Sequence, residues 1–179
     1  MKKPLLFIVI TFLFLFTLSL SSGCENSAKK DENGNSGKSG AWKNIELTDV
    51  KTGKKFRISD FKGKPVLLES FAVWCPTCKK QQDEIAKLHE KLGDSVVSVS
   101  VDTDPEEDKS RVLQHIERYD YSWRFALDKN GFAQSLVDEF GVNVVNAPSA
   151  PVVLIDANQK ARLLKFGVKS AQDLEKELD

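Results

Sequence analysis

The chain has little of what nucleic-acid surfaces and metal centres need. Its 179 residues include two histidines, three cysteines and one methionine. Lysine and arginine together number 26, aspartate and glutamate also number 26, and the formal net charge is zero. There is therefore no basic excess to attract nucleic acid and no acidic tail. Internal repeats are absent, and the apolar content of 41% is ordinary for a globular domain.

The few metal-binding residue types are also badly spaced. His89 lies about 16 Å along a predicted helix from Cys78, far beyond ligand distance. His115 is expected at the surface of a later helix. The carboxylates between Asp104 and Asp108 are adjacent and lack loop-spaced partners, so they are interpreted as the start of that helix. We predict no metal ligand and no cofactor.

The one long apolar run stands at the start of the chain. Lys2 and Lys3 precede residues 5–20, a run slightly short for a spanning helix but typical of a signal peptide or a tight anchor. The small residues that follow lead to Cys24 and resemble a lipoprotein cleavage box, although Ser21 stands where leucine is usual. The resemblance implies a lipidated Cys24. An uncleaved anchor or a plain secretory signal remain as alternatives, and all three place the domain outside the cytoplasm.

Residues 1–24 are thus predicted to be a targeting or anchoring segment, and residues 25–40 a flexible linker. The linker is almost entirely polar and cannot bury enough apolar surface to order itself. As a flexible coil it would span about 20–25 Å. The folded domain is predicted to occupy residues 41–179.

The domain is organised around residues 66–78. Val66 to Phe71 is a short apolar run bounded by Pro65, which predicts a buried strand. From residue 79 to 92 the apolar residues recur at spacings of three and four, which predicts a helix ended by Gly93. Cys75 and Cys78 therefore lie on a strand-to-helix turn, at the positive end of a helix dipole.

That position suits reversible disulfide chemistry. A helix N-terminus stabilises anions and favours a thiolate. Two cysteines three residues apart can close a bridge without large backbone movement. Cys75, near the exposed end, can attack a disulfide, and Cys78 can then resolve the mixed disulfide that forms. An inert disulfide or half of a metal site is the alternative interpretation.

With Trp74 in front, the motif W-C-P-T-C resembles that of the thioredoxin superfamily. Glu69 lies six residues before Cys75, where thioredoxins carry a buried aspartate. The resemblance implies that Glu69 takes and returns the proton of Cys78. Desolvation would raise the pKa of a carboxyl in this apolar strand, unless strand alternation points Glu69 to solvent. Trp74, Pro76 and Thr77 are implied to shape the substrate-binding surface.

The flanking segments are similar to the TlpA-like and redoxin-like branch of that superfamily. Alternation around Leu47 and Phe56 predicts a leading β-hairpin, and residues 104–127 predict a helix-plus-strand insertion. The predicted fold is a thioredoxin-like α/β three-layer sandwich, with a central mixed β-sheet and helices on both faces. A strand from Arg162 to Phe166 and a last helix capped by Ser170 complete it.

Two prolines compete for the cis-proline that the resemblance implies beside the dithiol. Pro148 is followed by serine and is nearer the family spacing, whereas Pro151 abuts the strand predicted from Val152. Cis peptide bonds are almost confined to proline. A backbone edge there could pair with an extended substrate. We favour Pro148 and keep Pro151 as the alternative.

The predicted function is that of an extracytoplasmic thiol–disulfide oxidoreductase acting on client proteins, with a preference for reduction. Disulfide-containing or dithiol clients, a membrane redox partner that recharges the dithiol, and the membrane itself are the implied partners. A peroxiredoxin-like peroxidase is one alternative, although Val73-Trp74 replaces the pattern expected before its cysteine. A non-enzymatic copper-delivery module and a structural interaction domain are the others; an exposed reactive dithiol argues against the last.

Overall fold

The computed structural model describes residues 40–178. Cys24, the targeting segment predicted for residues 1–24 and all of the predicted linker except Gly40 lie outside the described residues. Between residues 40 and 178, no helix combines the length and apolar character needed to cross a membrane.

A five-stranded mixed sheet forms the middle layer, with strand order β5-β4-β3-β6-β7. Strand β3 pairs in parallel with β4 and antiparallel with β6, and β5 and β7 form the edges. The strands are β3 (Val66–Phe71), β4 (Val97–Asp102), β5 (Arg124–Leu127), β6 (Val152–Ile155) and β7 (Ala161–Leu163). Strand β3 takes the centre because all six of its residues are buried, as a strand covered on both faces requires.

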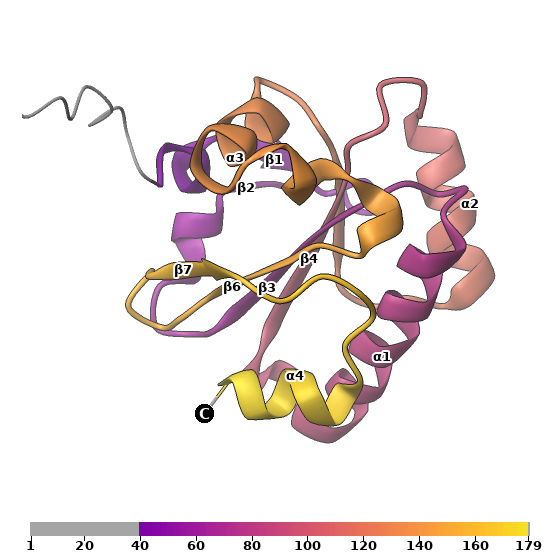
Figure 1. The fold of residues 1–179 in the computed structure, drawn as a ribbon. Coiled ribbons are helices and arrows are strands. Elements are labelled where there is room, and N and C mark those ends of the chain that lie inside the picture. Colours follow the sequence, from indigo (N-terminus) through magenta and orange to yellow (C-terminus); the bar gives the residue numbers. More distant parts are fainter. Residues whose placement is uncertain (1–39, 179) are drawn as a thin grey trace, which may run out of the picture. The chain divides into compact units, whose positions relative to one another are not determined.

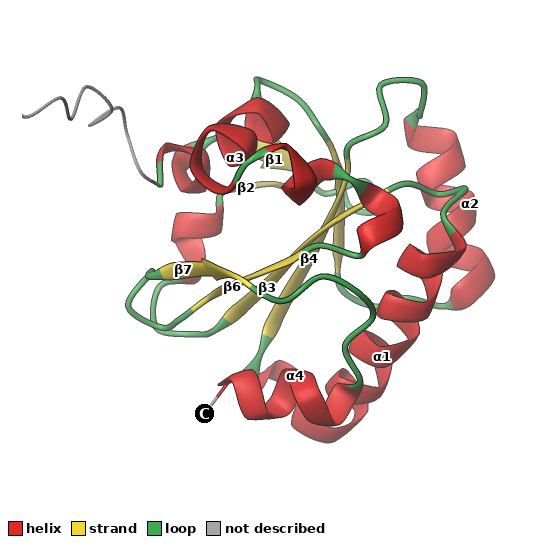
Figure 2. Ribbon diagram, viewed as in Figure 1, coloured by secondary structure: helices red, strands yellow, loops and turns green. Residues whose placement is uncertain are grey.

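Helices cover both faces of the sheet (Figures 1 and 2). On one face lie α1 (Pro76–Leu92), α2 (Lys109–Tyr119) and α4 (Ala171–Leu178), whose apolar residues join a core with Leu67 and Phe71 of β3. On the other face lie α3 (Phe132–Phe140) and the hairpin of β1 (Leu47–Thr48) and β2 (Lys55–Phe56). The predicted three-layer fold, its hairpin and its inserted α2–β5 unit are confirmed.

Some boundaries differ from the sequence-based expectations. The hairpin strands are two residues each, and Ile58 lies in a following 3-10 turn. The last strand ends at Leu163 instead of Phe166. The acidic run after β4 is a loop, of which only Asp108 caps α2 by accepting a hydrogen bond from the Arg111 N–H. A single N-cap suffices to start a helix, so the other carboxylates need not join it.

Strand β4 carries a buried polar stripe. Its valines face α3, and Ser98, Ser100 and Asp102 face α1 with 1% or less of their surface exposed. Polar residues alternating with valine normally indicate a face open to solvent. Here that face lies under helices, and the serines find hydrogen-bond partners there instead of water. These partners place β4 inside the candidate site.

Candidate functional site: a dithiol above a buried carboxyl

The two cysteines of the W-C-P-T-C motif lie where β3 ends and α1 begins. Cys75 is the N-cap residue of α1, with extended backbone, and Pro76 occupies the first turn. Proline suits that turn because its missing N–H would have no helical partner there. The Cys78 N–H donates to Cys75 Sγ at 3.2 Å. The sulfur therefore accepts the bond that a serine or aspartate accepts at an ordinary helix start.

Both thiols are free and buried, which corrects the expectation of an exposed dithiol. Cys75 is 2% exposed and Cys78 fully buried, whereas Trp74 between β3 and the dithiol is 56% exposed. Both cysteines pack into the apolar core shared by β3 and α1. Pro76 is exposed and Thr77 half-buried.

Cys78 holds its proton firmly. Its Sγ donates to the backbone oxygen of Ala147 at 3.2 Å. Burial raises the pKa of the Cys78 thiol, and a hydrogen bond with Cys75 and the charge of Glu69 act in the same direction. A thiol in such surroundings needs a nearby base before it can attack a disulfide.

Glu69 lies close enough to Cys78 for its charge to raise the pKa of that thiol, and none of its surface is exposed. Its Oε2 accepts hydrogen bonds from Gln82 Nε2 at 3.1 Å and from Ser100 Oγ at 2.8 Å. Its Oε1 has no hydrogen-bond partner among the described residues. Burial raises the pKa of Glu69 to about 8, against the opposing effect of the two donors. The carboxyl can thus exchange a proton near neutral pH, and the solvent-facing alternative is excluded.

Four residues that the sequence interpretation missed surround Glu69. Gln82 and Ser100 bond it directly; behind them, His115 Nε2 lies 2.7 Å from Gln82 Oε1 and Trp123 Nε1 lies 3.0 Å from Ser100 Oγ. The prediction of His115 at the surface is wrong: it is 7% exposed, because aromatic side chains of β3, α2 and β5 and of the loop between α2 and β5 enclose it. One sequence signal did exist: Gln82 follows Cys78 by four residues, which places both on one helix face.

The two candidate prolines occupy different settings. Pro148 is exposed within a short turn (Ala147–Ser149), and Pro151 is buried directly before β6. Between them Ala150 adopts a left-handed conformation with φ 47°. Its carbonyl accepts a hydrogen bond from the buried Lys169 Nζ at 2.6 Å. The assignment of Pro148 or Pro151 as the cis-proline stays a prediction.

A second buried carboxyl lies beside the motif. Asp102 pairs with Phe71 across β3 and β4 and is 1% exposed. Burial raises the pKa of Asp102 to about 7. The adjacent Asp104 accepts a hydrogen bond from the Trp74 indole, which fixes the orientation of this exposed ring.

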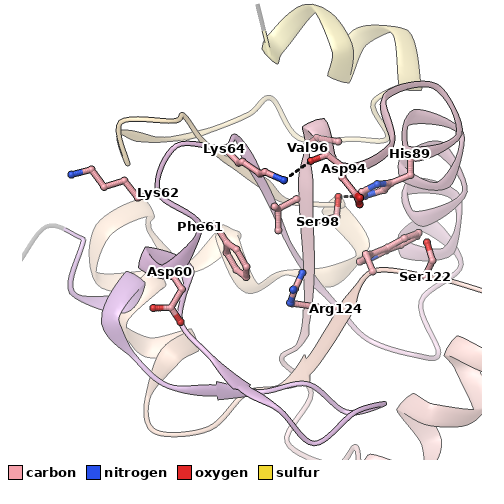
Figure 3. Close-up of a pocket in the computed structure, with 12 residues that line it drawn as sticks. Asp60, Phe61, Lys62, Lys64, His89, Asp94, Val96, Ser98, Ser122 and Arg124 are labelled. Carbon is pink, nitrogen blue, oxygen red and sulfur yellow. Dashed lines mark hydrogen bonds between the residues drawn. The ribbon is translucent and has the colours of Figure 1, made fainter.

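A polar pocket of about 400 Å³ lies at the opposite end of the parallel strands (Figure 3). Lys64 there donates to the backbone oxygen of Asp94, and His89 bonds Ser98. The pocket includes neither cysteine and not Glu69. Within residues 40–178, no group of three or more histidine, cysteine, aspartate or glutamate side chains is arranged to hold a metal ion.

Comparison with known proteins gives the family. The family model described as Redoxin matches residues 35–178. The chain belongs to the Redoxin family. This redoxin is 29% identical to the thiol-disulfide oxidoreductase ResA of Bacillus cereus, over 99% of this chain and 96% of the relative. It is 26% identical to the thioredoxin-like protein YneN of Bacillus subtilis, over 72% of this chain and 71% of the relative.

Solved structures agree on the fold of this redoxin. A secreted Mycobacterium tuberculosis disulfide oxidoreductase, described as homologous to E. coli DsbE, matches with a TM-score of 0.61 and 16% identity, covering 77% of this chain and 96% of that chain. A DsbF homologue from Corynebacterium diphtheriae gives a TM-score of 0.61 at 18% identity, covering 74% and 80%. The resemblance to the thioredoxin superfamily is confirmed.

Proposed function

We propose that this redoxin is a thiol–disulfide oxidoreductase that reduces disulfides of client proteins outside the cytoplasm. The observation that carries the proposal is the Cys75–Cys78 pair at the start of α1, set above the buried carboxyl of Glu69. The family and the names of the relatives support the same activity. This dithiol and this base are what two-step thiol–disulfide exchange requires.

The reaction begins at Cys75. Its thiolate attacks one sulfur of the client disulfide, that bond breaks, and the other client sulfur leaves as a thiolate. Cys78 then transfers its proton to Glu69 and attacks the Cys75 sulfur of the mixed disulfide. A Cys75–Cys78 disulfide forms and the second client thiol is released. The client gains two electrons and the dithiol loses two.

The location rests on the N-terminal segment. Residues 1–24 combine two lysines, an apolar run and Cys24, which supports a lipid anchor on the outer side of a membrane. Because each turnover leaves this redoxin oxidised, continued reduction needs an electron donor. A membrane dithiol protein that recharges the Cys75–Cys78 disulfide is the partner we propose.

Trapping experiments test the function. The Cys78→Ser variant should accumulate a mixed disulfide with client proteins, because nothing then resolves the bond to Cys75. The Cys75→Ser variant, which retains a buried cysteine, is the matched control and should trap none. Non-reducing electrophoresis with mass spectrometry reads the adducts. Adducts on Cys75→Ser but not on Cys78→Ser would reverse the roles, and adducts on neither would reject exchange with protein disulfides.

The direction of transfer needs a second measurement. Equilibrating the protein with a thiol couple of known potential gives its reduction potential, and each 30 mV corresponds to about 1.4 kcal/mol. A potential near that of thioredoxin, roughly −270 mV, supports a reductase. A potential near that of DsbA, roughly −120 mV, would instead indicate an oxidase.

A further inference from the structure

Two chains of hydrogen bonds converge on the same oxygen of Glu69. In the His115 chain, His115 Nε2 contacts Gln82 Oε1 at 2.7 Å, and Gln82 Nε2 donates to Glu69 Oε2 at 3.1 Å. In the Trp123 chain, Trp123 Nε1 donates to Ser100 Oγ at 3.0 Å, and Ser100 donates to the same oxygen at 2.8 Å. The four residues come from α1, α2 and β4 and from the residue before β5.

In each chain of hydrogen bonds, the donor and the acceptor of every bond are fixed. An indole N–H can only donate, so Trp123 occupies a lone pair of Ser100 and the serine hydroxyl points its one proton at Glu69. The amide of Gln82 has two ends, and its oxygen faces His115 only if His115 Nε2 carries a proton. That tautomer therefore turns the NH₂ group of Gln82 toward Glu69. Gln82 itself is fully buried, so water cannot replace either contact.

We propose that His115 and Gln82 are positioning residues that set the proton affinity of Glu69. By holding a fixed donor against Oε2, they stabilise the ionised form of Glu69, so that it is populated near neutral pH. The other oxygen, Oε1, is left for the proton exchanged with Cys78. The proposal deepens the proposed function and rests on it, because Glu69 is there the proton acceptor of Cys78. His115 makes no hydrogen bond to either cysteine, and its link to Glu69 runs through Gln82.

The surroundings of both groups fit these roles. Burial lowers the pKa of His115 to about 4, so the ring is neutral at physiological pH. The ionisable groups that influence His115 are Arg118 of α2 and Lys79 and Asp83 of α1. Those around Glu69 are Cys78 of α1, Lys169 before α4 and Tyr121 before β5. Neither Gln82 nor Ser100 is ionisable, so their donated bonds persist across the pH range in which Glu69 titrates.

Substitutions at Gln82 and His115 give the test. In the full-length protein in its dithiol form, the carboxyl ¹³C shift of Glu69 is followed by NMR from pH 6 to 10. Gln82→Met keeps the size but removes the donor, and should move the midpoint upward by about one to two pH units. His115→Phe keeps an aromatic ring but frees the Gln82 amide, and should move the midpoint in the same direction by less.

His89 offers the matched control. It is also a partly buried histidine with a lowered pKa, stacks on Trp123 and bonds Ser98, but contacts no donor of Glu69. His89→Phe keeps the stacking and should leave the midpoint unmoved. In parallel, the pH at which the resolution rate levels off should rise in Gln82→Met and His115→Phe and stay constant in His89→Phe.

Three results would decide against the proposal. Folded Gln82→Met and His115→Phe proteins with an unshifted Glu69 midpoint would overturn it, and so would an equal shift in His89→Phe. If the variants do not fold, the ¹⁵N shifts of His115 in the wild type test the proposal instead, because they report which ring nitrogen carries the proton. A proton on Nδ1 instead of Nε2 would contradict the His115 chain. Shifted midpoints combined with no client adducts on Cys78→Ser would reject the proposed function and leave the His115 chain standing.

Discussion

At the scale of single residues, the site is a balance between burial and donated hydrogen bonds. Glu69 is completely enclosed, which favours its protonated form, and two donors on one oxygen favour the carboxylate. The outcome, a pKa of about 8, lies where a proton can be both taken and returned. Cys78, whose pKa is raised chiefly by burial, is the thiol that we propose this carboxyl deprotonates.

Glu69→Gln should therefore slow resolution of the mixed disulfide. The amide keeps the shape but accepts no proton, so the rate should fall about 10²-fold or more at and below pH 8. The wild-type rate should rise with pH and level off near 8, where the carboxyl is ionised. The variant should lack this plateau, so the difference narrows at higher pH. Stopped-flow mixing of the dithiol protein with a client disulfide, following the decay of the mixed disulfide that forms, checks this, and identical profiles would remove Glu69 from the mechanism.

The same substitution should stabilise the fold in a defined pH window. The pKa of Glu69 is raised from 4.5 to about 8, so between these values the folded protein binds more protons than the unfolded chain. The stability of the wild type consequently falls as pH rises from 4.5 to 8. Glu69→Gln should show no such loss and should gain on the order of a few kcal/mol at pH 8.

Urea unfolding at pH 4.5, 6 and 8 measures this difference. Asp102, whose pKa is raised to about 7 by burial, is present in both proteins and its contribution cancels. A stability difference that does not grow with pH would show that Glu69 is ionised in the folded protein well below pH 8.

At the scale of elements, the segment before α4 is tied to the middle of α1. The buried side chain of Gln81 donates to the backbone oxygen of Lys169 at 3.2 Å and accepts from its N–H at 2.8 Å. Lys169 in turn holds the Ala150 carbonyl, and the Gly167 N–H donates to the Ser149 oxygen at 2.8 Å. Gln81 thus anchors the loop that accepts the Cys78 thiol hydrogen bond.

Gln81→Ala should loosen that loop. The change leaves two buried backbone groups of Lys169 unpaired, which costs about 2–4 kcal/mol. Hydrogen exchange should speed up in residues 147–151 and 165–169 before it does in β3 and β4. Gln134→Ala is the control: that side chain is exposed and bonds only Asp138, so its effect should stay within about 0.5 kcal/mol. Uniform loss of protection across the sheet would contradict the local role of Gln81.

The elements nearest the dithiol were the easiest to predict from sequence. The sequence predicts the strand Val66–Phe71 with its observed boundaries, because a short apolar run before a helical period is compatible with few other structures. Helix α1 begins three residues before its predicted start, at Pro76, because the apolar period appears only after the motif. The alternation of serine with valine in β4 indicates a strand with two unlike faces, but it does not show which face water reaches.

The hydrogen-bond chains could not be predicted in the same way. Glu69 is separated from Ser100 by 31 residues and Gln82 from His115 by 33. No local spacing connects such residues; only the pairing of β3 with β4 and the packing of α2 on the same face bring them together. The prediction of His115 at the surface is wrong because helical periodicity alone cannot show that four aromatic rings, those of Phe71, Tyr119, Tyr121 and Phe125, pack around it.

At the scale of the whole molecule, the proposed lipid anchor at Cys24 gives a test of how the protein is retained at a membrane. Cys24→Ser removes the sulfur to which a lipid would be attached, so the protein should lose membrane retention or fail to be processed. Fractionation of cells and the intact mass of the purified protein measure both. Cys75→Ser is the control, because its sulfur lies in the folded domain and its loss should leave retention unaffected. Unchanged mass and retention in Cys24→Ser would favour an uncleaved apolar anchor.

The three tryptophans differ in exposure, so their fluorescence can report on the surface beside the dithiol. All lie within residues 40–178; Trp42 is fully buried, Trp123 is 8% exposed and Trp74 is 56% exposed beside Cys75. A water-soluble quencher would therefore extinguish mainly the emission of Trp74. A client polypeptide covering the dithiol would shield that indole and shift its emission to shorter wavelength. Docking can thus be timed by fluorescence in the unlabelled protein, separately from the sulfur chemistry that follows it.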